Sequence, residues 1–198
     1  MTLPRTLRDL AGAPNRPHPL DRSAIVLIDA QNEYVDGAVP LPGIGAALQA
    51  GAALLDLART AGRPVVHIRH RGRAGGLFDP GTRAFEIAEQ VAPAEGEAVI
   101  DKPLPNAFAK TELESRLRSL GAESLIVAGF MTHMCVSSTV RCALDLGFGC
   151  TVVADACATR DLPDGQGGVV GAGELHRAEL AALADRFAVV VGSVQSLR

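Results

Sequence analysis

The sequence places a carboxylate, an amine and a thiol soon after three separate apolar runs: Asp29 (after 24–28), Lys102 (after 98–100) and Cys135 (after 124–128). A thiol attacks carbonyl carbon as its thiolate. A carboxylate can take the thiol proton and later deliver it to a leaving group. A nearby ammonium favours the anionic forms of both. If the fold brings these groups together, they predict nucleophilic catalysis by a cysteine.

Each of these residues also has an ordinary interpretation. Asp29 can cap a helix or a loop, and a lysine is usually a solvated surface charge. Lysine occurs in this chain only at positions 102 and 110, all other cations being arginine, which hints at a chemical role for Lys102. The four cysteines are 7, 8 and 7 residues apart. This spacing is typical neither of a zinc site nor of a disulfide framework, so we interpret the other three as reduced, structural thiols.

Apolar runs and helical patterns alternate along most of the chain. We predict strands at 24–28, 64–68, 98–100, 124–128, 149–154 and 188–191, and helices at 46–61, 82–91, 111–120, 135–146 and 174–187. Such alternation is typical of an α/β protein. We therefore expect a Rossmann-like three-layer α/β/α fold with a mostly parallel sheet of about six strands. Residues 1–20, rich in Pro and Arg, form an N-terminal arm in this prediction, and residues 21–198 form one domain.

A parallel sheet would bring the candidate residues together. The carboxyl ends of parallel strands meet at one edge, where ligands of open α/β sheets bind. Asp29, Lys102 and the segment 129–135 all lie at or just after predicted strand ends, as does His70. Cys135 also lies near the start of a predicted helix, whose N-terminal partial charge would lower the thiol pKa.

Composition excludes several other classes of protein. The chain has 198 residues, a net charge of −3 and 47% hydrophobic residues, which argues against a nucleic-acid-binding surface. The apolar runs are too short to span a membrane, and the first twenty residues lack the apolar core of a secretory signal. We therefore expect a cytoplasmic protein whose partner is a small molecule, without nucleic-acid or membrane partners.

Three motifs in order resemble the isochorismatase-like family of cysteine hydrolases, in particular its amidohydrolase branch that includes streptothricin hydrolase and N-carbamoylsarcosine amidase. The motifs are Asp29-Ala-Gln31-Asn-Glu-Tyr34, Ile100-Asp-Lys102 and Gly129-Phe-Met-Thr-His-Met-Cys135-Val136. The match in element order extends from about residue 22 to residue 192. The resemblance implies that Asp29, Lys102 and Cys135 form a catalytic triad and that the protein assembles into a homodimer or tetramer.

The same resemblance implies further site residues. It predicts a cis peptide bond between Phe130 and Met131 and an oxyanion hole formed by the N–H groups of Met131 and Cys135. The substrate pocket would be lined by four residues: Gln31, Tyr34, Phe108 and His133. For Phe108 a core position is an equal alternative, and for His133 a structural role is the alternative.

The region after the second predicted strand bears on the substrate. Nicotinamidases carry an Asp-x-His pair as metal ligands here, whereas this chain reads His67-Ile-Arg-His70-Arg-Gly-Arg73 with no acidic residue before Asp79. We therefore predict no metal and no cofactor, and hydrolysis of an amide, ureido or lactam-like C–N bond through a thioester. The basic residues Arg69, Arg71 and Arg73 form a solvated loop or, folded over the pocket, favour an anionic substrate. The alternatives are a nicotinamidase-type hydrolase with a degenerate metal site and a non-catalytic binding relative.

Overall fold

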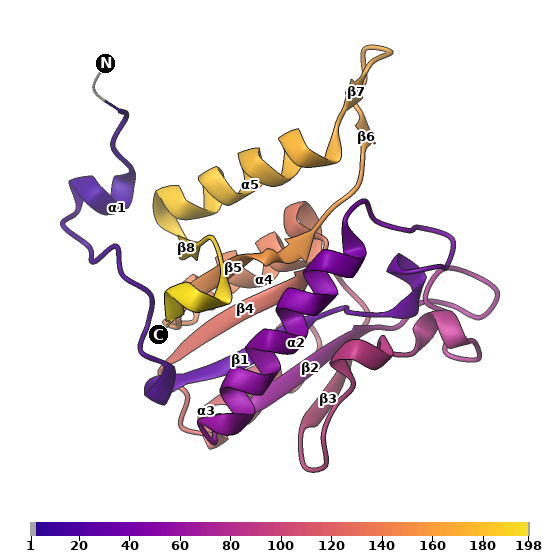
Figure 1. Ribbon diagram of the computed structural model, residues 1–198, viewed down its shortest axis with the longest axis horizontal. Coiled ribbons are helices and arrows are strands. Elements are labelled where there is room, and N and C mark those ends of the chain that lie inside the picture. The colour runs from indigo at the N-terminus through magenta and orange to yellow at the C-terminus, as the bar shows by residue number, and fades with distance from the viewer. Residues whose placement is uncertain (1–2, 198) are drawn as a thin grey trace.

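The computed structural model describes residues 3–197 and contains a six-stranded sheet in which every neighbouring pair is parallel (Figure 1). In spatial order the strands are β3 (Ala98–Lys102), β2 (Val65–His70), β1 (Ser23–Ile28), β4 (Ser124–Phe130), β5 (Gly149–Ala158) and β8 (Val189–Val191). Strands β1 and β4 are neighbours at the point where the chain order reverses. The order confirms the predicted Rossmann-like topology.

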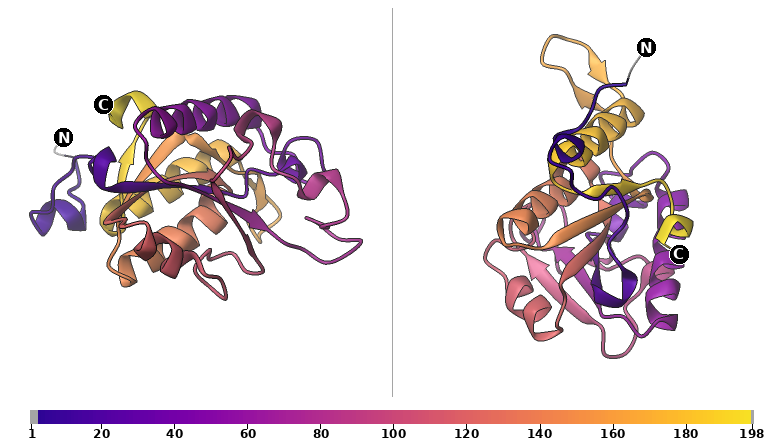
Figure 2. Two further views of the ribbon diagram at one scale, coloured as in Figure 1. Left: turned by 90° about the horizontal axis from the view of Figure 1, so that it is seen from below. Right: turned by 90° about the vertical axis from the view of Figure 1, so that its left-hand side faces the viewer.

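Helices cover both faces of the sheet (Figure 2). Helix α2 (Ile44–Thr60) lies on one face, and α3 (Leu113–Ser119), α4 (Ser137–Asp145) and α5 (Ala172–Arg186) lie on the other. The alternation of side chains along a strand explains this arrangement. In β1, Ile25 and Leu27 pack in the cluster under α2, whereas Val26 and Ile28 pack in the cluster under α3 and α4. A strand buried on both faces is therefore a continuous apolar run.

The helix predicted for residues 82–91 is wrong. The segment forms two 3₁₀ turns, Arg83–Phe85 and Glu89–Val91. Its backbone instead pairs with the loop after β1: the Asn32 N–H donates to the Glu86 carbonyl, and the Ala88 N–H donates to the Ala30 carbonyl. These inter-segment hydrogen bonds use groups that a continuous helix would need for its own turns.

Two further elements differ from the prediction. The helix expected at 135–146 consists of a π-helical turn, Thr132–Val136, followed by α4. A small antiparallel hairpin of β6 (Leu162–Pro163) and β7 (Val169–Val170), which we did not predict, projects from the body between β5 and α5 (Figure 1). Residues 164–168, three of which are glycine, form its turn.

The described part of the N-terminal arm runs outside the sheet. It contains the short helix α1 (Leu7–Leu10), where the Leu7 N–H donates to the Asp185 carboxylate of α5 at 2.8 Å. Further along, the His18 N–H donates to Thr151 Oγ1 at 2.9 Å. The division into an arm (1–20) and a domain (21–198) stays a prediction, and residues 1, 2 and 198 of those ranges lie outside the described residues.

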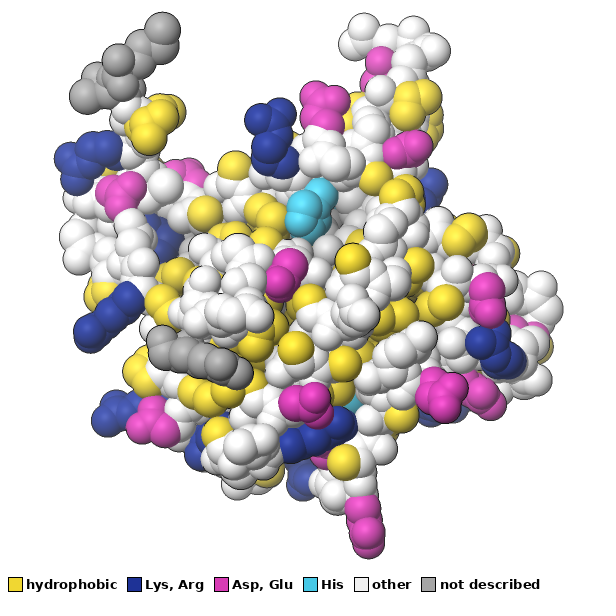
Figure 3. Space-filling view, in the orientation of Figure 1, with side chains coloured by type: hydrophobic (Ala, Val, Ile, Leu, Met, Phe, Trp, Pro, Cys, Tyr) yellow, Lys and Arg dark blue, Asp and Glu magenta, His cyan; other side chains and the backbone are white. Residues whose placement is uncertain are grey.

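Figure 3 shows the side of the molecule that faces the viewer in Figure 1. Acidic and basic side chains are intermingled on this side, without a continuous basic patch. Among residues 3–197, the helices are all too short or too polar to cross a lipid bilayer.

Gly129 makes the close approach of β4 to β1 possible next to the site. It pairs with Ile28 and has a φ of 120°. A Cβ atom at this position would lie 2.0 Å from the Ile28 carbonyl oxygen.

We expect Gly129→Ala to lower the free energy of unfolding by at least about 2 kcal/mol, since both the contact and the backbone conformation oppose a side chain. Urea unfolding measures the change. The matched control is Gly173→Ala in α5, where the added methyl meets no atom within 4 Å; comparable losses for the two variants would contradict the steric argument.

Candidate active site

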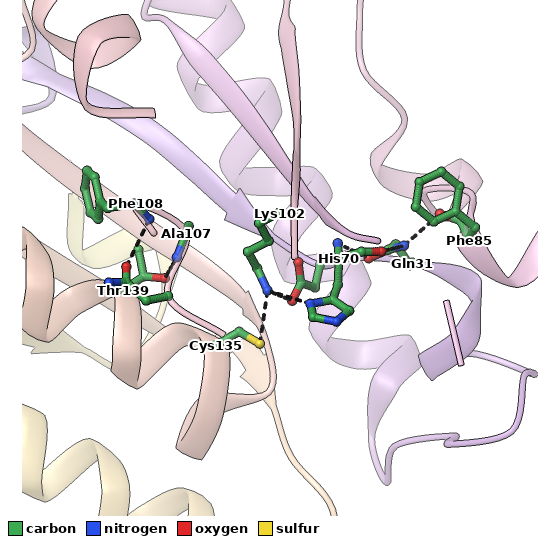
Figure 4. A network of polar contacts seen from close by, with 10 residues as sticks. Gln31, His70, Phe85, Lys102, Ala107, Phe108, Cys135 and Thr139 are labelled. Atoms are coloured by element: carbon green, nitrogen blue, oxygen red, sulfur yellow. Dashed lines mark hydrogen bonds and ion pairs between the residues drawn. The ribbon is translucent and has the colours of Figure 1, made fainter. Parts of the chain in front are cut away.

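The predicted carboxylate, amine and thiol meet at the carboxyl edge of the sheet, where Figure 4 shows the thiol and the amine pointing toward one another. The Nζ atom of Lys102 lies 2.8 Å from Oδ2 of Asp29 and 3.3 Å from Sγ of Cys135. Both Lys102 and Asp29 are 0% exposed, and Cys135 is buried as well. A single buried ammonium thus contacts an acid and a thiol.

Three strand ends position these groups. Asp29 directly follows β1 in the left-handed region, with a φ of 49°, and its N–H donates to the Ile68 carbonyl of β2 at 2.8 Å. Lys102 is the last residue of β3 and lies opposite His70 in the β2–β3 register. Because β3 is the edge strand beyond β2, the long lysine side chain is needed to reach Asp29.

The thiol comes from the π-helical turn after β4. In this turn the N–H groups of Met134 and Val136 donate to the Met131 carbonyl at 3.0 and 3.2 Å. The peptide bond between Phe130 and Met131 is cis, as the resemblance implied. The π-turn places Cys135 two residues before α4 begins at Ser137.

Burial controls the protonation of the acid and the thiol. Burial raises the pKa of Asp29, and the nearby Lys102 ammonium lowers it. The effect of burial is the larger, so the pKa of Asp29 is above its ordinary value. Burial and the charge of Asp29 raise the pKa of the Cys135 thiol to about 12. The lowered thiol pKa predicted from the helix start is therefore wrong, because loss of solvation outweighs the helix end. One cation lies beside two acids, so Asp29 and Cys135 titrate as a coupled pair.

A cavity of about 440 Å³ opens onto the thiol. Its lining residues include Tyr34, His70, Phe78, Met131, Cys135 and Arg160. The ring of Tyr34 packs edge-on against Phe78, with 5.1 Å between centroids. Burial raises the pKa of Tyr34, so its hydroxyl keeps its proton. The cavity thus combines apolar walls with a few polar groups, as small-molecule sites usually do.

Two loops that wall this cavity are joined by one buried carboxylate. Glu33 is 3% exposed. Its Oε1 accepts from the Ala38 N–H at 2.6 Å, and its Oε2 accepts from the Phe78 N–H at 2.9 Å. Ala38 and Phe78 both line the cavity, from loops 40 residues apart. Gly37 leaves room for Glu33, since a Cβ there would lie 2.6 Å from its Cα.

Of the predicted pocket residues, the structure brings Tyr34 to the cavity wall but leaves Gln31, Phe108 and His133 away from it. Gln31 is fully buried, and its amide bonds to backbone groups of the β2 end and the 3₁₀ turn. Phe108 stacks on Phe148 beneath α3 and α4. A ring nitrogen of His133 lies at hydrogen-bonding distance from Thr159 Oγ1. Substrate contact by Gln31, Phe108 and His133 stays a prediction.

The sequence analysis gave no role to several cavity residues. His70 was recognised only as lying at a strand end, and Arg160 was missed. Arg160 follows β5 by two residues, so the strand-end rule that found Asp29 could have found it. Phe78 comes from the loop after β2 and Met134 from the π-helical turn, and no sequence pattern indicates which way their side chains point.

Arg69, Arg71 and Arg73 are not among the residues that line the cavity, although Leu77 and Phe78 from the loop after β2 are. Arg69 and Arg71 both pair with Asp101, at 2.7 Å each, and their guanidinium groups lie over the Phe85 ring. These contacts direct them away from the thiol. Positive charge at the cavity comes instead from Arg160.

The residues at the β2 end do not fit a metal ion. Among residues 3–197, no three His, Cys, Asp or Glu side chains form a group that could hold one. The candidate ligand His70 faces the Lys102 ammonium, with 3.2 Å between its Nδ1 and the lysine Nζ. A cation at this nitrogen would compete with a buried ammonium that is already in place.

Comparison with known proteins identifies the family. The isochorismatase domain profile matches residues 23–195, and the chain belongs to the isochorismatase family. A crystal structure of an isochorismatase from Pseudomonas putida superposes with a TM-score of 0.92 and 46% identity, covering 96% of this chain and 97% of that one. The secreted isochorismatase effector Isc1 of Verticillium dahliae is 36% identical over 95% of this chain and 97% of its own. A streptothricin hydrolase of Streptomyces noursei is 37% identical over 71% of this chain and 51% of its own.

The electrostatics of the site predict opposite shifts for two substitutions. Asp29 raises the pKa of Cys135 and Lys102 lowers it. Asp29→Asn should therefore lower the thiol pKa, and Lys102→Met should raise it further. The pH dependence of iodoacetamide alkylation, with the modified residue assigned by mass spectrometry, measures both. Cys135→Ala gives the background from the other three thiols. A shift of the Asp29→Asn profile to higher pH would show that the carboxylate does not act on the thiol as a negative charge.

Proposed function

We propose that the protein is a cysteine hydrolase that cleaves an amide, ureido or lactam-like C–N bond of a small molecule through a thioester. The observation that carries this proposal is the Lys102 ammonium, which contacts both the Asp29 carboxylate and the Cys135 thiol beside a cavity. Membership of the isochorismatase family supports it, as does the similarity to a streptothricin hydrolase.

In the proposed first half-reaction, Asp29 takes the proton of the Cys135 thiol. The sulfur forms a bond to the carbonyl carbon, and the carbonyl π electrons move to oxygen. The N–H groups of Met131 and Cys135, two residues that line the cavity, are proposed to stabilise this oxyanion. Asp29 then gives its proton to the nitrogen as the C–N bond breaks, leaving a thioester.

In the second half-reaction, Asp29 removes a proton from water, and the resulting hydroxide attacks the thioester carbon. The C–S bond breaks, the acid product leaves and sulfur regains a proton from Asp29. Burial raises the pKa of Asp29, which supports this role because a carboxylate with a raised pKa is a better proton acceptor. Lys102 keeps one positive charge beside whichever of the two is anionic.

The cavity suggests which substrates to test. Aromatic and aliphatic walls next to the Arg160 guanidinium favour a small molecule with an apolar part and a negatively charged or acceptor-rich part. The most informative experiment measures ammonia or amine release over paired carboxamides, ureides and lactams, each pair with and without a carboxylate. Turnover that is lost in Cys135→Ala supports the proposal. The proposal is contradicted if no compound is turned over and the Cys135 thiol does not react with alkylating agents.

The remaining expectations are also proposals. A cytoplasmic location is suggested by four cysteines that are all unpaired among the described residues, although one relative is named a secreted effector. A homodimer or tetramer is expected from the family resemblance. The proposed ligand is a small molecule, with no nucleic-acid or membrane partner and no cofactor.

Substitutions in the triad should stop the chemistry while leaving the fold intact. We expect Cys135→Ala to reduce turnover below a hundredth of wild type, and Cys135→Ser to be nearly as weak, since a hydroxyl is a much poorer acid than a thiol. Lys102→Ala and Asp29→Asn should each lower kcat by at least about two orders of magnitude. Their combined effect should be far from additive, because both act on one thiol. Steady-state kinetics with circular dichroism as the fold control measure this; a Lys102→Ala kcat within a few-fold of wild type refutes the triad.

Metal removal separates the proposal from the nicotinamidase alternative. Because the His70 nitrogen faces an ammonium, we expect dialysis against a chelator to leave kcat/KM unchanged. Activity that is lost on chelation and recovered with zinc, iron or manganese would favour a nicotinamidase-type enzyme instead.

A further inference from the structure

His70 lies at the end of β2 with one ring nitrogen on Lys102 and its side chain on the cavity wall. A lysine ammonium has three N–H groups and no acceptor. Around Lys102 the acceptors are the Asp29 carboxylate, the Cys135 sulfur and the Nδ1 atom of His70. His70 therefore completes the hydrogen bonding of a fully buried charge.

This contact determines the tautomer of the imidazole. Nδ1 must be the acceptor, because the lysine can only donate. Burial and the Lys102 charge lower the pKa of His70 to about 4, so the ring is neutral at neutral pH and its proton is on Nε2. Within residues 3–197, no hydrogen-bond partner faces that Nε2–H, and the ring lines the cavity.

The imidazole is also held firmly in this orientation. The Gln31 amide clamps the His70 backbone on both sides: its Oε1 accepts from the His70 N–H at 2.7 Å, and its Nε2 donates to the His70 carbonyl at 3.0 Å. The Phe78 ring packs edge-on against the imidazole, with 5.1 Å between centroids. Groups fixed by such surrounding contacts are preorganised for ligand binding.

We propose that His70 has two separable roles, in which Nδ1 positions the Lys102 ammonium and Nε2–H donates a hydrogen bond to an acceptor next to the scissile carbonyl of the substrate. This proposal deepens the proposed function and rests on it for the identity of the reaction. It predicts that good substrates carry a second oxygen or nitrogen acceptor close to the bond that is cleaved.

Two substitutions separate the roles. An asparagine oxygen can replace Nδ1 as the acceptor for Lys102, but it leaves nothing at the position of Nε2–H. A glutamine amide reaches the Nε2 position and can supply the N–H donor, but it withdraws the acceptor from Lys102. Both variants keep the backbone groups that Gln31 clamps.

The experiment compares two alkylating agents on Cys135. Iodoacetamide carries a carbonyl acceptor beside its reactive carbon, whereas propyl iodide has none. Relative to wild type, His70→Asn should lower the ratio of the iodoacetamide rate to the propyl iodide rate by about 10-fold and leave the propyl iodide pH profile unchanged. His70→Gln should keep the ratio and shift that pH profile. On any amide that wild type hydrolyses, His70→Asn should raise KM about 10-fold or more.

The matched control is His18→Asn, which changes another half-buried histidine whose Nδ1 also has a side-chain partner, on the arm beside β5; it should alter neither readout. An unchanged ratio in His70→Asn overturns the donor role, and an unchanged pH profile in His70→Gln overturns the positioning role. Failure of the proposed function has a different signature: wild type and Cys135→Ala would be equally inactive on every amide, while the alkylation ratios would still depend on residue 70.

Discussion

The buried ammonium of Lys102 is the interaction on which the rest of the site depends. A charge with no solvent exposure is tolerated only where hydrogen bonds and an opposite charge replace its hydration. Asp29, Cys135 and His70 supply those replacements from three other strand ends. Removal of any one leaves part of a buried cation uncompensated, so catalytic geometry and local stability depend on the same contacts.

The order of strands makes this meeting possible. The sheet runs β3-β2-β1-β4-β5-β8, so the acid after β1 and the thiol after β4 are neighbours at the reversal point, although 106 positions separate them in the chain. The lysine reaches them from β3, across the end of β2. A shorter cationic side chain at position 102 would reach only the end of β2 and would not contact Asp29 or Cys135. The long aliphatic stem of lysine therefore serves as a bridge over one strand width.

The sequence indicated those aspects that depend on local pattern and on sheet topology. Apolar runs such as 24–28 marked strands buried on both faces, and the rule for parallel strand ends brought Asp29, Lys102 and Cys135 together. Side-chain direction in irregular segments could not be predicted: Gln31 turned to the backbone of His70, and Phe108 to Phe148. The sign of the thiol pKa shift was also out of reach, because it depends on how completely the surrounding loops exclude water, a property of tertiary packing.

The Glu33 carboxylate holds two loops of the cavity at a fixed spacing. One side chain accepts from the loop at Ala38 and from the loop at Phe78, so the spacing of two loops that line the cavity is set by the dimensions of a single carboxyl group. If either wall swung outward, a buried anion would lose one of its two donors, which ties the two loops into one frame. Leu77 and Met134, which line the same cavity, have partly exposed side chains, with exposed fractions of 48% and 37%. The cavity thus combines a loop spacing fixed by one buried carboxyl group with two flexible, partly exposed aliphatic side chains.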